Sequence, residues 1–374
     1  MKILYVVNCS SFFNSHFLHL AVSLKEMGHD VYISAGNEVQ RSKFEGLGFH
    51  FELLPLSRSG KNIFSELVAI NSIRKVFSKI KPDYVHMYTI KPMLYGGLVN
   101  KFLLRNRPNK VIFSVTGLGS ASMSLSFKGR LLWKALNYIY RIIFNVSNAR
   151  VVFENHDDKK LFIEYGIVNE WRSSIVDGAG VDMGEFFPGS NAPNLVSIIL
   201  VARLLKDKGV REYIDAGRIL KENDVPVELL LVGSTDPDNP SSMAVNEIEL
   251  ASNRGYVKVL GFRSDIAECY RSASVACLPS YREGLPKSLI EAAACGLPII
   301  TSDVPGCRQM VHGGENGILV PEKNSILLAK AIENLVYDSE LRTKMGIRSR
   351  EIAEIKYSKE TIQSSFFDIY GIGD

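Results

Sequence analysis

Two glutamates, Glu283 and Glu291, are the side chains whose type and spacing first suggest chemistry in this sequence. Glu283 lies in a loop with glycine and proline, and Glu291 lies in an alanine-rich segment. We predict that this segment is a helix from Ser288, ending at Cys295-Gly296. Exposed loop amides beside a helix N-terminus favour a ligand that is anionic or rich in hydroxyl groups. The alternative is a capping glutamate followed by an ordinary helical glutamate.

A pair of basic residues, Arg203 and Lys208, follows an apolar segment that reads as a strand and precedes a segment that reads as a helix. An arginine fork and a lysine point charge that meet at a helix N-terminus suit a diphosphate group. Basic residues are also common on solvated loops, which is the alternative for this pair.

Two further loops of the second half have features that suit a nucleotide. Gly233 ends a predicted strand and permits close approach of the backbone to a ligand. The loop that carries Phe262 and Arg263 offers backbone groups and an aromatic ring, beside which a nucleobase could lie.

Strands and helices alternate along both halves of the chain. The expected elements of the first half are strands at 3–7, 31–35, 49–54, 84–86 and 111–115, with helices at 16–27 and 40–47. Those of the second half are strands at 196–201, 228–232, 257–260, 275–278 and 298–301, with helices at 210–222, 242–252 and 266–272. Such alternation predicts an α/β fold of parallel sheets, with ligands bound at the carboxyl ends of the strands. In the first half those ends carry Ser11, His86 and Thr116.

A polar stretch rich in proline and glycine, 181–194, separates the two halves and reads as a linker. We therefore expect a first domain over 1–187, a second over 188–355, and a final helix within 356–374 that returns to the first domain. Two such halves would leave a cleft between them, where ligands usually bind.

Composition places the chain among ordinary globular proteins, with 46% hydrophobic and 22% charged residues. The five cysteines are scattered and form no Cys-x-x-Cys pair, which predicts reduced thiols rather than a disulfide framework or a zinc site. The apolar run at the N-terminus is too short for a signal-peptide core, and no apolar run in the sequence is long enough to cross a membrane. We expect a cytoplasmic protein.

Charge is unevenly distributed. Residues 1–187 carry 23 Lys and Arg against 15 Asp and Glu, and residues 58–150 carry 16 basic residues with only Glu66 and Asp83 as acids. So concentrated a surplus implies an anionic partner for the first half. Nucleic acid fits less well than lipid, because no nucleic-acid-binding motif accompanies the charge.

Two basic amphipathic segments in this region, 63–80 and 127–146, predict contact with an anionic membrane surface. The first has apolar residues at helical spacing (Ile63, Leu67, Ile70, Ile73, Phe77 and Ile80). The basic residues that we expect at an acceptor or membrane surface are Arg74, Lys75, Lys128, Arg130, Lys134 and Arg141. The alternative is that each segment is a helix with its apolar side packed on the core and its basic side exposed to solvent.

Together these features resemble retaining glycosyltransferases of family 4, which have the two-domain GT-B fold. Arg203 and Lys208, the Gly261-Phe262 loop and the two glutamates occur in the order and spacing of that family. The resemblance covers essentially the whole chain and is most specific over 196–321. In the first half it narrows to transferases that act on polyprenyl-diphosphate-linked sugars in bacterial glycan assembly, through the segments 116–119, 153–158 and 177–182.

The resemblance implies roles for individual residues. Arg203 and Lys208 would bind the donor diphosphate, and Glu291 the ribose hydroxyls. Glu283 would hold the donor sugar beside Gly284, Leu285 and Pro286, and the uracil edge would meet the backbone near Phe262 and Arg263. Arg203, Lys208 and Glu283 are therefore the expected catalytic residues. Gly233, Ser11 and His16 complete the expected donor-binding set.

The sequence departs from the family at two places in the first half. No glycine occurs between Asn8 and His16, where many members have a Gly-Gly pair. Thr116 stands where many members have a histidine that contacts the donor sugar. Thr116 itself and His86 are the further catalytic candidates, and His16 and His86 are the nearest histidines. Either histidine could instead be an ordinary loop or core residue.

The sequence thus predicts a peripheral membrane enzyme of the inner membrane face that moves a sugar, expected to be an N-acetylhexosamine, from a UDP-sugar to a polyprenyl-diphosphate-linked sugar. Neither an essential metal nor a further cofactor is expected. Two other GT-B activities, epimerase and phosphorylase, remain as alternatives. A non-catalytic nucleotide-sugar-binding scaffold subunit is the alternative outside enzymology.

Overall fold

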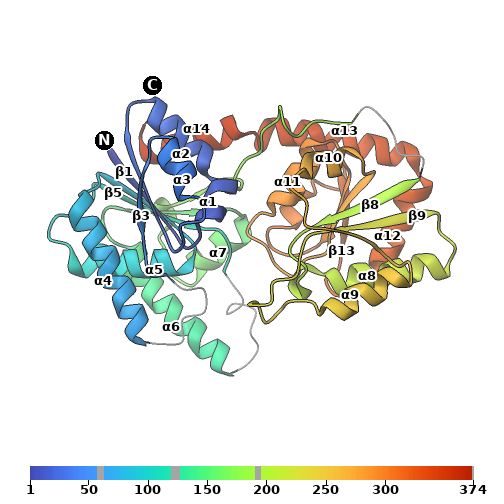
Figure 1. Cartoon of the computed structure of the whole chain (residues 1–374), viewed down its shortest axis with the longest axis horizontal. Coiled ribbons are helices and arrows are strands. Elements are labelled where there is room, and N and C mark those ends of the chain that lie inside the picture. Colours follow the sequence, from blue (N-terminus) through green and yellow to red (C-terminus); the bar gives the residue numbers. More distant parts are fainter. Residues whose placement is uncertain (57–62, 119–126, 190–194, 373–374) are drawn as a thin grey trace. The chain divides into compact units, whose positions relative to one another are not determined.

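A computed structural model describes residues 1–56, 63–118, 127–189 and 195–372 of the chain (Figure 1). The chain divides into two compact units, Met1–Ala179 with Ile362–Asp374, and Gly180–Thr361. The division falls before the boundary expected at 187/188. Val181 is buried in the core of the second unit, and its backbone N–H donates to the Tyr357 carbonyl at 2.8 Å.

The first unit is built on seven parallel strands in the order β3-β2-β1-β4-β5-β6-β7, and the order reverses between β1 and β4. Their bounds are β1 (Lys2–Val7), β2 (Asp30–Ala35), β3 (His50–Leu53), β4 (Tyr84–Tyr88), β5 (Lys110–Val115), β6 (Ala149–Phe153) and β7 (Ser173–Ile175). The predicted parallel α/β architecture is confirmed for this half.

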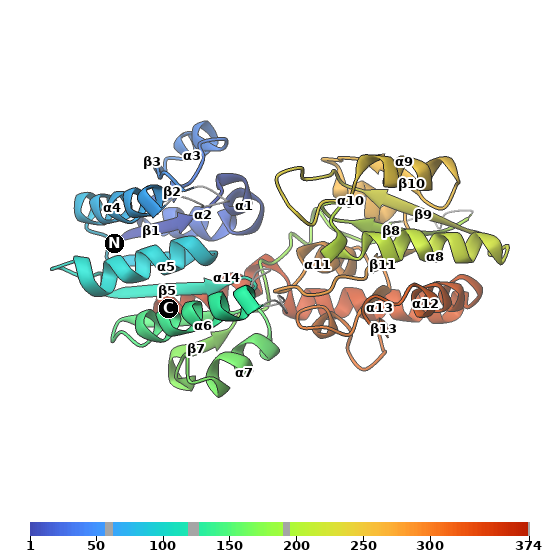
Figure 2. The same cartoon turned by 90° about the horizontal axis from the view of Figure 1, so that it is seen from below.

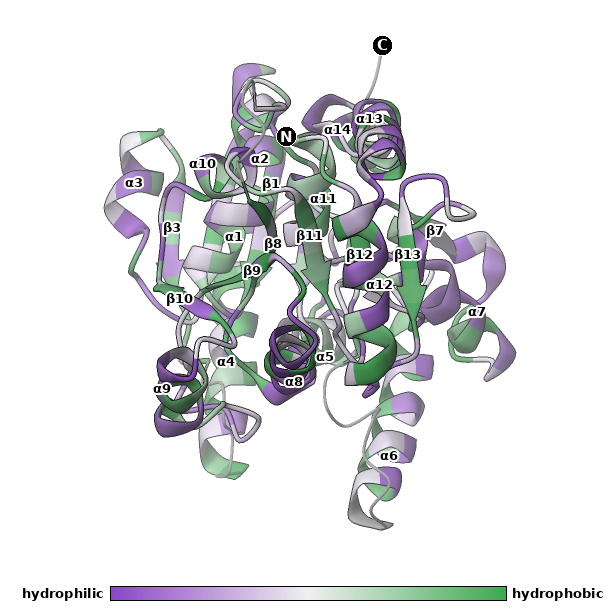
Figure 3. Cartoon of the chain, turned by 90° about the vertical axis from the view of Figure 1, so that its right-hand side faces the viewer, coloured by the Kyte–Doolittle hydropathy of each residue, from purple (hydrophilic) through white to green (hydrophobic). Residues whose placement is uncertain are grey.

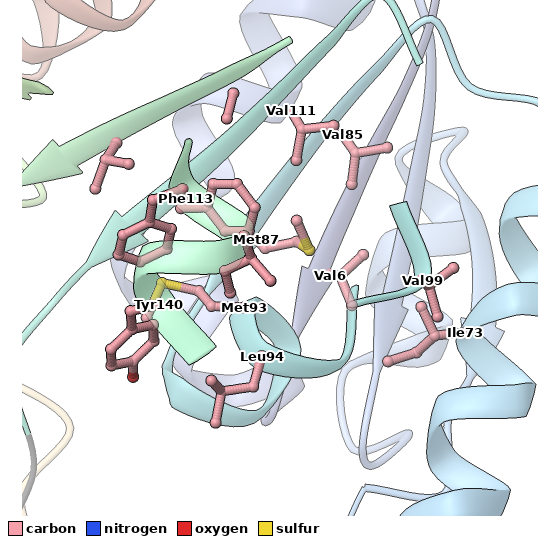
Figure 4. Close-up of a cluster of buried hydrophobic side chains, with 14 of the residues drawn as sticks. Val6, Ile73, Val85, Met87, Met93, Leu94, Val99, Val111, Phe113 and Tyr140 are labelled. Carbon is pink, nitrogen blue, oxygen red and sulfur yellow. The ribbon is translucent and has the colours of Figure 1, made fainter. Parts of the chain in front are cut away.

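Side chains of β1 alternate between two cores, as the pleat of a strand requires. Leu4 and Val6 face a core formed with α4 (Ile63–Ile80), α5 (Ile90–Leu98), α6 (Phe127–Phe144) and α7 (His156–Glu164). In this core Ile73, Met93 and Tyr140 come from the first three of these helices. Met93 and Tyr140 lie near the sheet residues Met87 and Phe113, and Ile73 lies beside Val99 (Figure 4). Helices α4, α5 and α6 lie side by side as a layer on this face (Figure 2).

The opposite face of the first sheet is covered by α1 (Ser10–His16), α2 (Leu18–Glu26), α3 (Arg41–Gly46) and α14 (Lys359–Tyr370). The helix expected over 16–27 is present as α2, whereas α1 was not predicted. Phe17 leaves helical geometry (φ −130°, ψ 6°) and separates the two helices. Helix α14 places Ile362, Phe366 and Tyr370 in this core. The Ser23 hydroxyl donates to the Gln363 side chain at 2.9 Å, which ties α14 to α2.

The second unit is built on six parallel strands in the order β10-β9-β8-β11-β12-β13, and here the order reverses between β8 and β11. The strands are β8 (Val196–Val201), β9 (Val227–Val232), β10 (Lys258–Gly261), β11 (Val275–Leu278), β12 (Ile299–Ser302) and β13 (Gly317–Val320). The helices are α8 (Val210–Glu222), α9 (Val245–Asn253), α10 (Ile266–Arg271), α11 (Lys287–Ala294), α12 (Ser325–Tyr337) and α13 (Ser339–Lys356). Two parallel-sheet, Rossmann-like halves are therefore confirmed.

Two absences concern the described part of the chain. None of its helices is long and apolar enough to pass through a bilayer. Among the same residues, no group of three or more His, Cys, Asp and Glu side chains is placed to hold a metal ion.

Candidate active site

The loop between β8 and α8 carries the basic pair of the second unit. Arg203 is about half exposed, and its Nη1 donates to the Asp236 carboxylate at 2.7 Å. Lys208 ends a short 3₁₀ turn, and Gly209 follows it with φ +70°. A Cβ at Gly209 would lie 2.0 Å from the Pro279 carbonyl oxygen, so glycine lets this loop pack against the loop that follows β11.

Lys208 and Glu283 are brought together by this packing. The Lys208 ammonium donates to both carboxylate oxygens of Glu283, at 2.5 and 2.8 Å, and the Ser280 hydroxyl donates to the same carboxylate at 2.6 Å. Only 12% of the Glu283 side chain and 23% of the Lys208 side chain are exposed. The pair thus joins the loops after β8 and β11, which flank the reversal of strand order where α/β sheets bind ligands.

The loop after β12 holds the Glu283 backbone in place. The Glu283 N–H donates to the Pro305 carbonyl at 3.2 Å. Gly306 has φ +80°, and a Cβ there would lie 2.6 Å from the Glu283 carbonyl oxygen and 2.3 Å from that of Gly284. The sequence prediction missed Gly306, although the Pro-Gly turn signalled a tight loop.

Glu291 lies one turn into α11 and forms an ion pair with Lys287, the first residue of that helix. Burial raises the pKa of the Glu291 carboxyl above its usual range, and the Lys287 ammonium opposes that rise. The expectation of exposed loop amides before the helix was wrong, because Gly284, Leu285 and Pro286 are buried. Lys287 was also missed, although its spacing of four residues from Glu291 was visible in the sequence.

The loops after β9 and β10 complete this edge of the second sheet. Gly233 has φ +140°, and a Cβ there would lie 1.9 Å from the Ala202 carbonyl oxygen. Its N–H donates to the Gly261 carbonyl at 2.8 Å, which ties the two loops together. Phe262 is 78% exposed, and the Arg263 guanidinium is paired with Asp265. An exposed ring beside a paired arginine can stack on a planar group.

His86, predicted as a catalytic candidate in the first unit, is wrong for that role. It lies in the middle of β4, is fully buried, and has no solvent-accessible surface. Its Nδ1 is 2.6 Å from the Tyr370 hydroxyl and its Nε2 is 2.6 Å from the Ser114 hydroxyl. Burial lowers the pKa of His86 well below its usual value. His86 is therefore a neutral core residue that connects β4 to α14.

The other candidates of the first unit lie near the carboxyl edge of its sheet. Ser11 and His16 belong to α1, the helix that follows β1, and both are half-buried. The His16 ring stacks on Phe12 with centroids 4.4 Å apart, and its Nδ1 is 2.7 Å from the Ser15 hydroxyl. Thr116 is half-buried directly after β5. The roles assigned to Ser11, His16 and Thr116 stay predictions.

The basic candidates of the first unit fall into two groups. Arg74, Lys75, Arg130 and Lys134 have exposed side chains, and Lys128 lies in α6 but outside the residues whose side chains the structure describes. Arg141 is exposed too, and its guanidinium also donates to the carbonyls of Tyr165 at 2.6 Å and Gly166 at 2.9 Å, where α7 ends.

The apolar residues of α4 also divide. Ile73, Phe77 and Ile80 are buried against the sheet, as the core-facing alternative for this segment required, whereas Ile63 and Leu67 are exposed.

Two Rossmann-like units with a charged carboxyl edge define the class of GT-B glycosyltransferases, and solved structures support that fold. HepE from Anabaena, solved with UDP, superposes with a TM-score of 0.77 over 99% of this chain and 100% of its own, at 19% identity. Sucrose-phosphate synthase from Thermosynechococcus elongatus gives a TM-score of 0.80 over 99% of this chain and 98% of its own, at 18% identity.

Family models and sequence relatives identify the family. Residues 2–155 match the glycosyl transferase 4-like family, and residues 185–352 match glycosyl transferases group 1. The N,N'-diacetylbacillosaminyl-diphospho-undecaprenol alpha-1,3-N-acetylgalactosaminyltransferase of Campylobacter jejuni is 27% identical over 369 residues, which cover 95% of this chain and 94% of that relative. A UDP-Gal:alpha-D-GlcNAc-diphosphoundecaprenol alpha-1,3-galactosyltransferase of Escherichia coli is 25% identical, covering 71% and 69%. The chain thus carries a glycosyl transferase 4-like domain and a glycosyl transferases group 1 domain, one in each half, and its prediction as a glycosyltransferase is confirmed.

Proposed function

We propose that the enzyme transfers a sugar, an N-acetylhexosamine, from a UDP-sugar to a polyprenyl-diphosphate-linked sugar in bacterial glycan assembly. The observation that carries the donor side of this proposal is the Lys208–Glu283 pair, which lies at the reversal of strand order in the second sheet. The acceptor side is supported by the names of the relatives from Campylobacter jejuni and Escherichia coli, which both specify an undecaprenol-diphosphate-linked sugar.

The residues predicted at the carboxyl edge of the second sheet each have a part in donor binding. Arg203 and Lys208 hold the diphosphate and stabilise the charge that develops on the leaving UDP, the kind of electrostatic stabilisation that lowers a barrier most. Glu283 is fixed by Lys208 and Ser280 and accepts hydrogen bonds from the donor-sugar hydroxyls. Glu291 binds the ribose hydroxyls, and Phe262 and Arg263 lie beside the uracil. With two cations at the diphosphate, we propose that no metal or other cofactor is required.

The reaction retains the anomeric configuration of the donor sugar. We propose that Ser11, His16 and Thr116 contribute to the sugar site from the first unit. The acceptor lipid places the enzyme at the inner face of the cell membrane as a peripheral protein.

A transfer assay tests the function. The enzyme is incubated with a panel of UDP-sugars and a short-chain polyprenyl-diphosphate-linked sugar, and the products are separated by chromatography. We expect transfer from at least one UDP-N-acetylhexosamine, an anomeric proton signal that shows retention, and a loss of about 100-fold in rate for Glu283→Gln. The proposal is contradicted by epimerised donor, by turnover that needs orthophosphate, or by UDP-sugar binding without any turnover.

A further inference from the structure

The N-terminal end of α4 exposes a group of large apolar side chains. Ile63 and Phe64 are each 78% exposed, Leu67 is 57% exposed and Val68 is 55% exposed. The remainder of the helix buries its apolar residues in the core (Ala69, Ile73, Val76, Phe77 and Ile80). A contiguous exposed apolar group of this kind marks an interaction site. In Figure 3 the N-terminal end of α4 is green, the colour of hydrophobic residues.

Helical spacing puts this group on a single face that becomes cationic further along. Phe64, Leu67 and Val68 are three and four residues apart, and the same face continues to Lys75, with Arg74 at its border. Both basic side chains are exposed. The outer face of α4 therefore has an apolar end followed by a cationic half.

The one acidic residue of α4 does not interrupt this face. Glu66 accepts from the Lys91 ammonium at 2.9 Å and from the Tyr95 hydroxyl, and both of these partners belong to α5. Only 23% of its side chain is exposed. The negative charge of Glu66 is thus directed into the helix layer and is offset there by Lys91.

Helix α6 repeats the pattern. Leu131, Leu132 and Tyr138 are 60%, 53% and 66% exposed, and the side chains of Arg130 and Lys134 among them are exposed as well. The sequence of α6 contains no acidic residue.

Helices α4 and α6 lie on either side of α5 in one layer (Figure 2). Each helix follows a parallel strand, β3 or β5, so both N-terminal ends emerge at the carboxyl edge of the same sheet. Ile63, Phe64, Leu67, Val68, Leu131 and Leu132 lie in the first two turns of these helices, and Tyr138 lies further along α6.

We propose that the first turns of α4 and α6 insert into the interface of an anionic lipid bilayer. We call their exposed apolar residues the paired helix ends (Ile63, Phe64, Leu67, Val68, Leu131 and Leu132). Apolar residues bordered by lysine and arginine, with the acid turned inward, complement acyl chains below anionic head groups. The inference rests on the proposed function only in its choice of partner, since a lipid-linked acceptor requires a bilayer.

This arrangement also deepens the proposed function. The paired helix ends emerge at the edge of the first sheet that carries Ser11, His16 and Thr116. Insertion there brings the head-group layer, where the diphosphate of a polyprenyl acceptor lies, to the predicted sugar-binding residues. The protein binds the bilayer by apolar insertion as well as by charge. It should therefore stay bound at high salt, where the charges of its basic residues are screened.

Vesicle flotation of the whole chain tests the proposal. The probes are vesicles of phosphatidylcholine alone and with about one third phosphatidylglycerol, in low and high salt. Phe64→Glu/Leu67→Glu is expected to weaken partition into anionic vesicles by about tenfold or more, from the lost burial of two large apolar side chains. Ile326→Glu/Ile355→Glu is the matched control, because Ile326 and Ile355 are 70% and 69% exposed on helices of the second unit. Control partition should equal wild type.

Insertion has its own readout. Phe64→Trp fluorescence should be quenched by lipids brominated along the acyl chain, and that of Ile326→Trp should not. Equal flotation of the two double variants, or no quenching of Phe64→Trp, overturns the proposal. So does a lipid-free dimer of the wild type that Phe64→Glu/Leu67→Glu dissociates in sedimentation, because the occupant would then be a second copy.

The failure of the proposed function would look different. UDP affinity and transfer to a short-chain, detergent-soluble acceptor do not depend on the paired helix ends. A chain that floats as predicted but transfers no sugar would refute the function and leave the surface standing.

Discussion

The carboxyl edges of the two sheets are built in opposite ways. In the second unit the edge is charged and constrained: Lys208 is held between two oxygens of Glu283, and glycines 209, 233 and 306 let adjacent loops touch where any side chain would overlap a carbonyl oxygen. In the first unit the edge has half-buried polar residues such as Ser11 and Thr116, and its exposed apolar side chains gather near the ends of α4 and α6.

Under the two proposals, one architecture serves two kinds of ligand. A diphosphate needs charges fixed before it arrives, because positioning them at binding would cost free energy. A lipid bilayer needs exposed apolar side chains that leave water when they become buried in it. If the second edge is pre-ordered for a nucleotide, two kinds of substitution should have large and separable effects. Replacing a glycine that lets two loops pack together should change the free energy of unfolding, and replacing a charged residue should change the affinity for UDP.

The largest effect on stability is expected at Gly209, where the loops after β8 and β11 pack together. Gly209→Ala forces a Cβ into the Pro279 carbonyl oxygen at a positive φ and should lower the free energy of unfolding of the second unit by about 3 kcal/mol or more. Gly313→Ala is the matched control, with φ +56° and no atom within 4 Å of the added Cβ, and should cost only about 1 kcal/mol. Urea unfolding measures both. Equal losses would mean that the loops after β8 and β11 do not clamp each other.

A smaller effect is expected from the ion pair in α11. The charged groups around the Glu291 carboxyl are Lys287 on its own helix and Glu185 from the segment before β8, and Tyr270 of α10 and Cys295 beyond α11 also face it. Burial already raises the Glu291 pKa, and Lys287→Met removes the one nearby cation that lowers it. The carboxyl then keeps its proton to higher pH, and as an acid it accepts ribose hydroxyl hydrogen bonds less well.

Calorimetric titration of UDP from pH 5.5 to 8 checks this coupling. Lys287→Met should bind UDP several-fold more weakly than wild type at the acidic end, about 1 kcal/mol for a lost charged hydrogen bond, and should recover as the pH rises. Adding Glu291→Gln should remove the extra pH dependence. A pH profile parallel to wild type would show that Lys287 does not set the charge of Glu291.

The second unit could be predicted closely from sequence, because its strands are short apolar runs bounded by glycine or polar loops. The expected bounds of β8, α8 and β11 were reproduced residue for residue. The carboxyl-edge rule also placed Arg203, Lys208 and Glu283 on one edge. It could not predict the Lys208–Glu283 contact or the Ser280 hydrogen bond to Glu283, because loop conformations set both. The close approach of these loops depends on Gly209 and Gly306.

The first unit was harder for identifiable reasons. His86 was assigned to the end of a strand, but β4 continues to Tyr88, and alternation then directs the imidazole into the core with Tyr370. In α4, one apolar pattern was expected, whereas two sets are present: Ile73, Phe77 and Ile80 face the sheet, and Phe64 and Val68 face away from it. Periodicity cannot separate these sets, because residues on both faces of the first turns are apolar.

The measurement that tests the account most directly is a calorimetric titration of UDP into four proteins: wild type, Lys208→Ala, Glu291→Ala and Phe64→Glu/Leu67→Glu. We predict losses of about 10- to 100-fold in affinity for Lys208→Ala and Glu291→Ala, since each removes a charged hydrogen-bonding group, and no change for the helix-end variant. Equal affinity in all four proteins, or weaker binding only in the variant of the first unit, would contradict a nucleotide site at the charged edge of the second sheet.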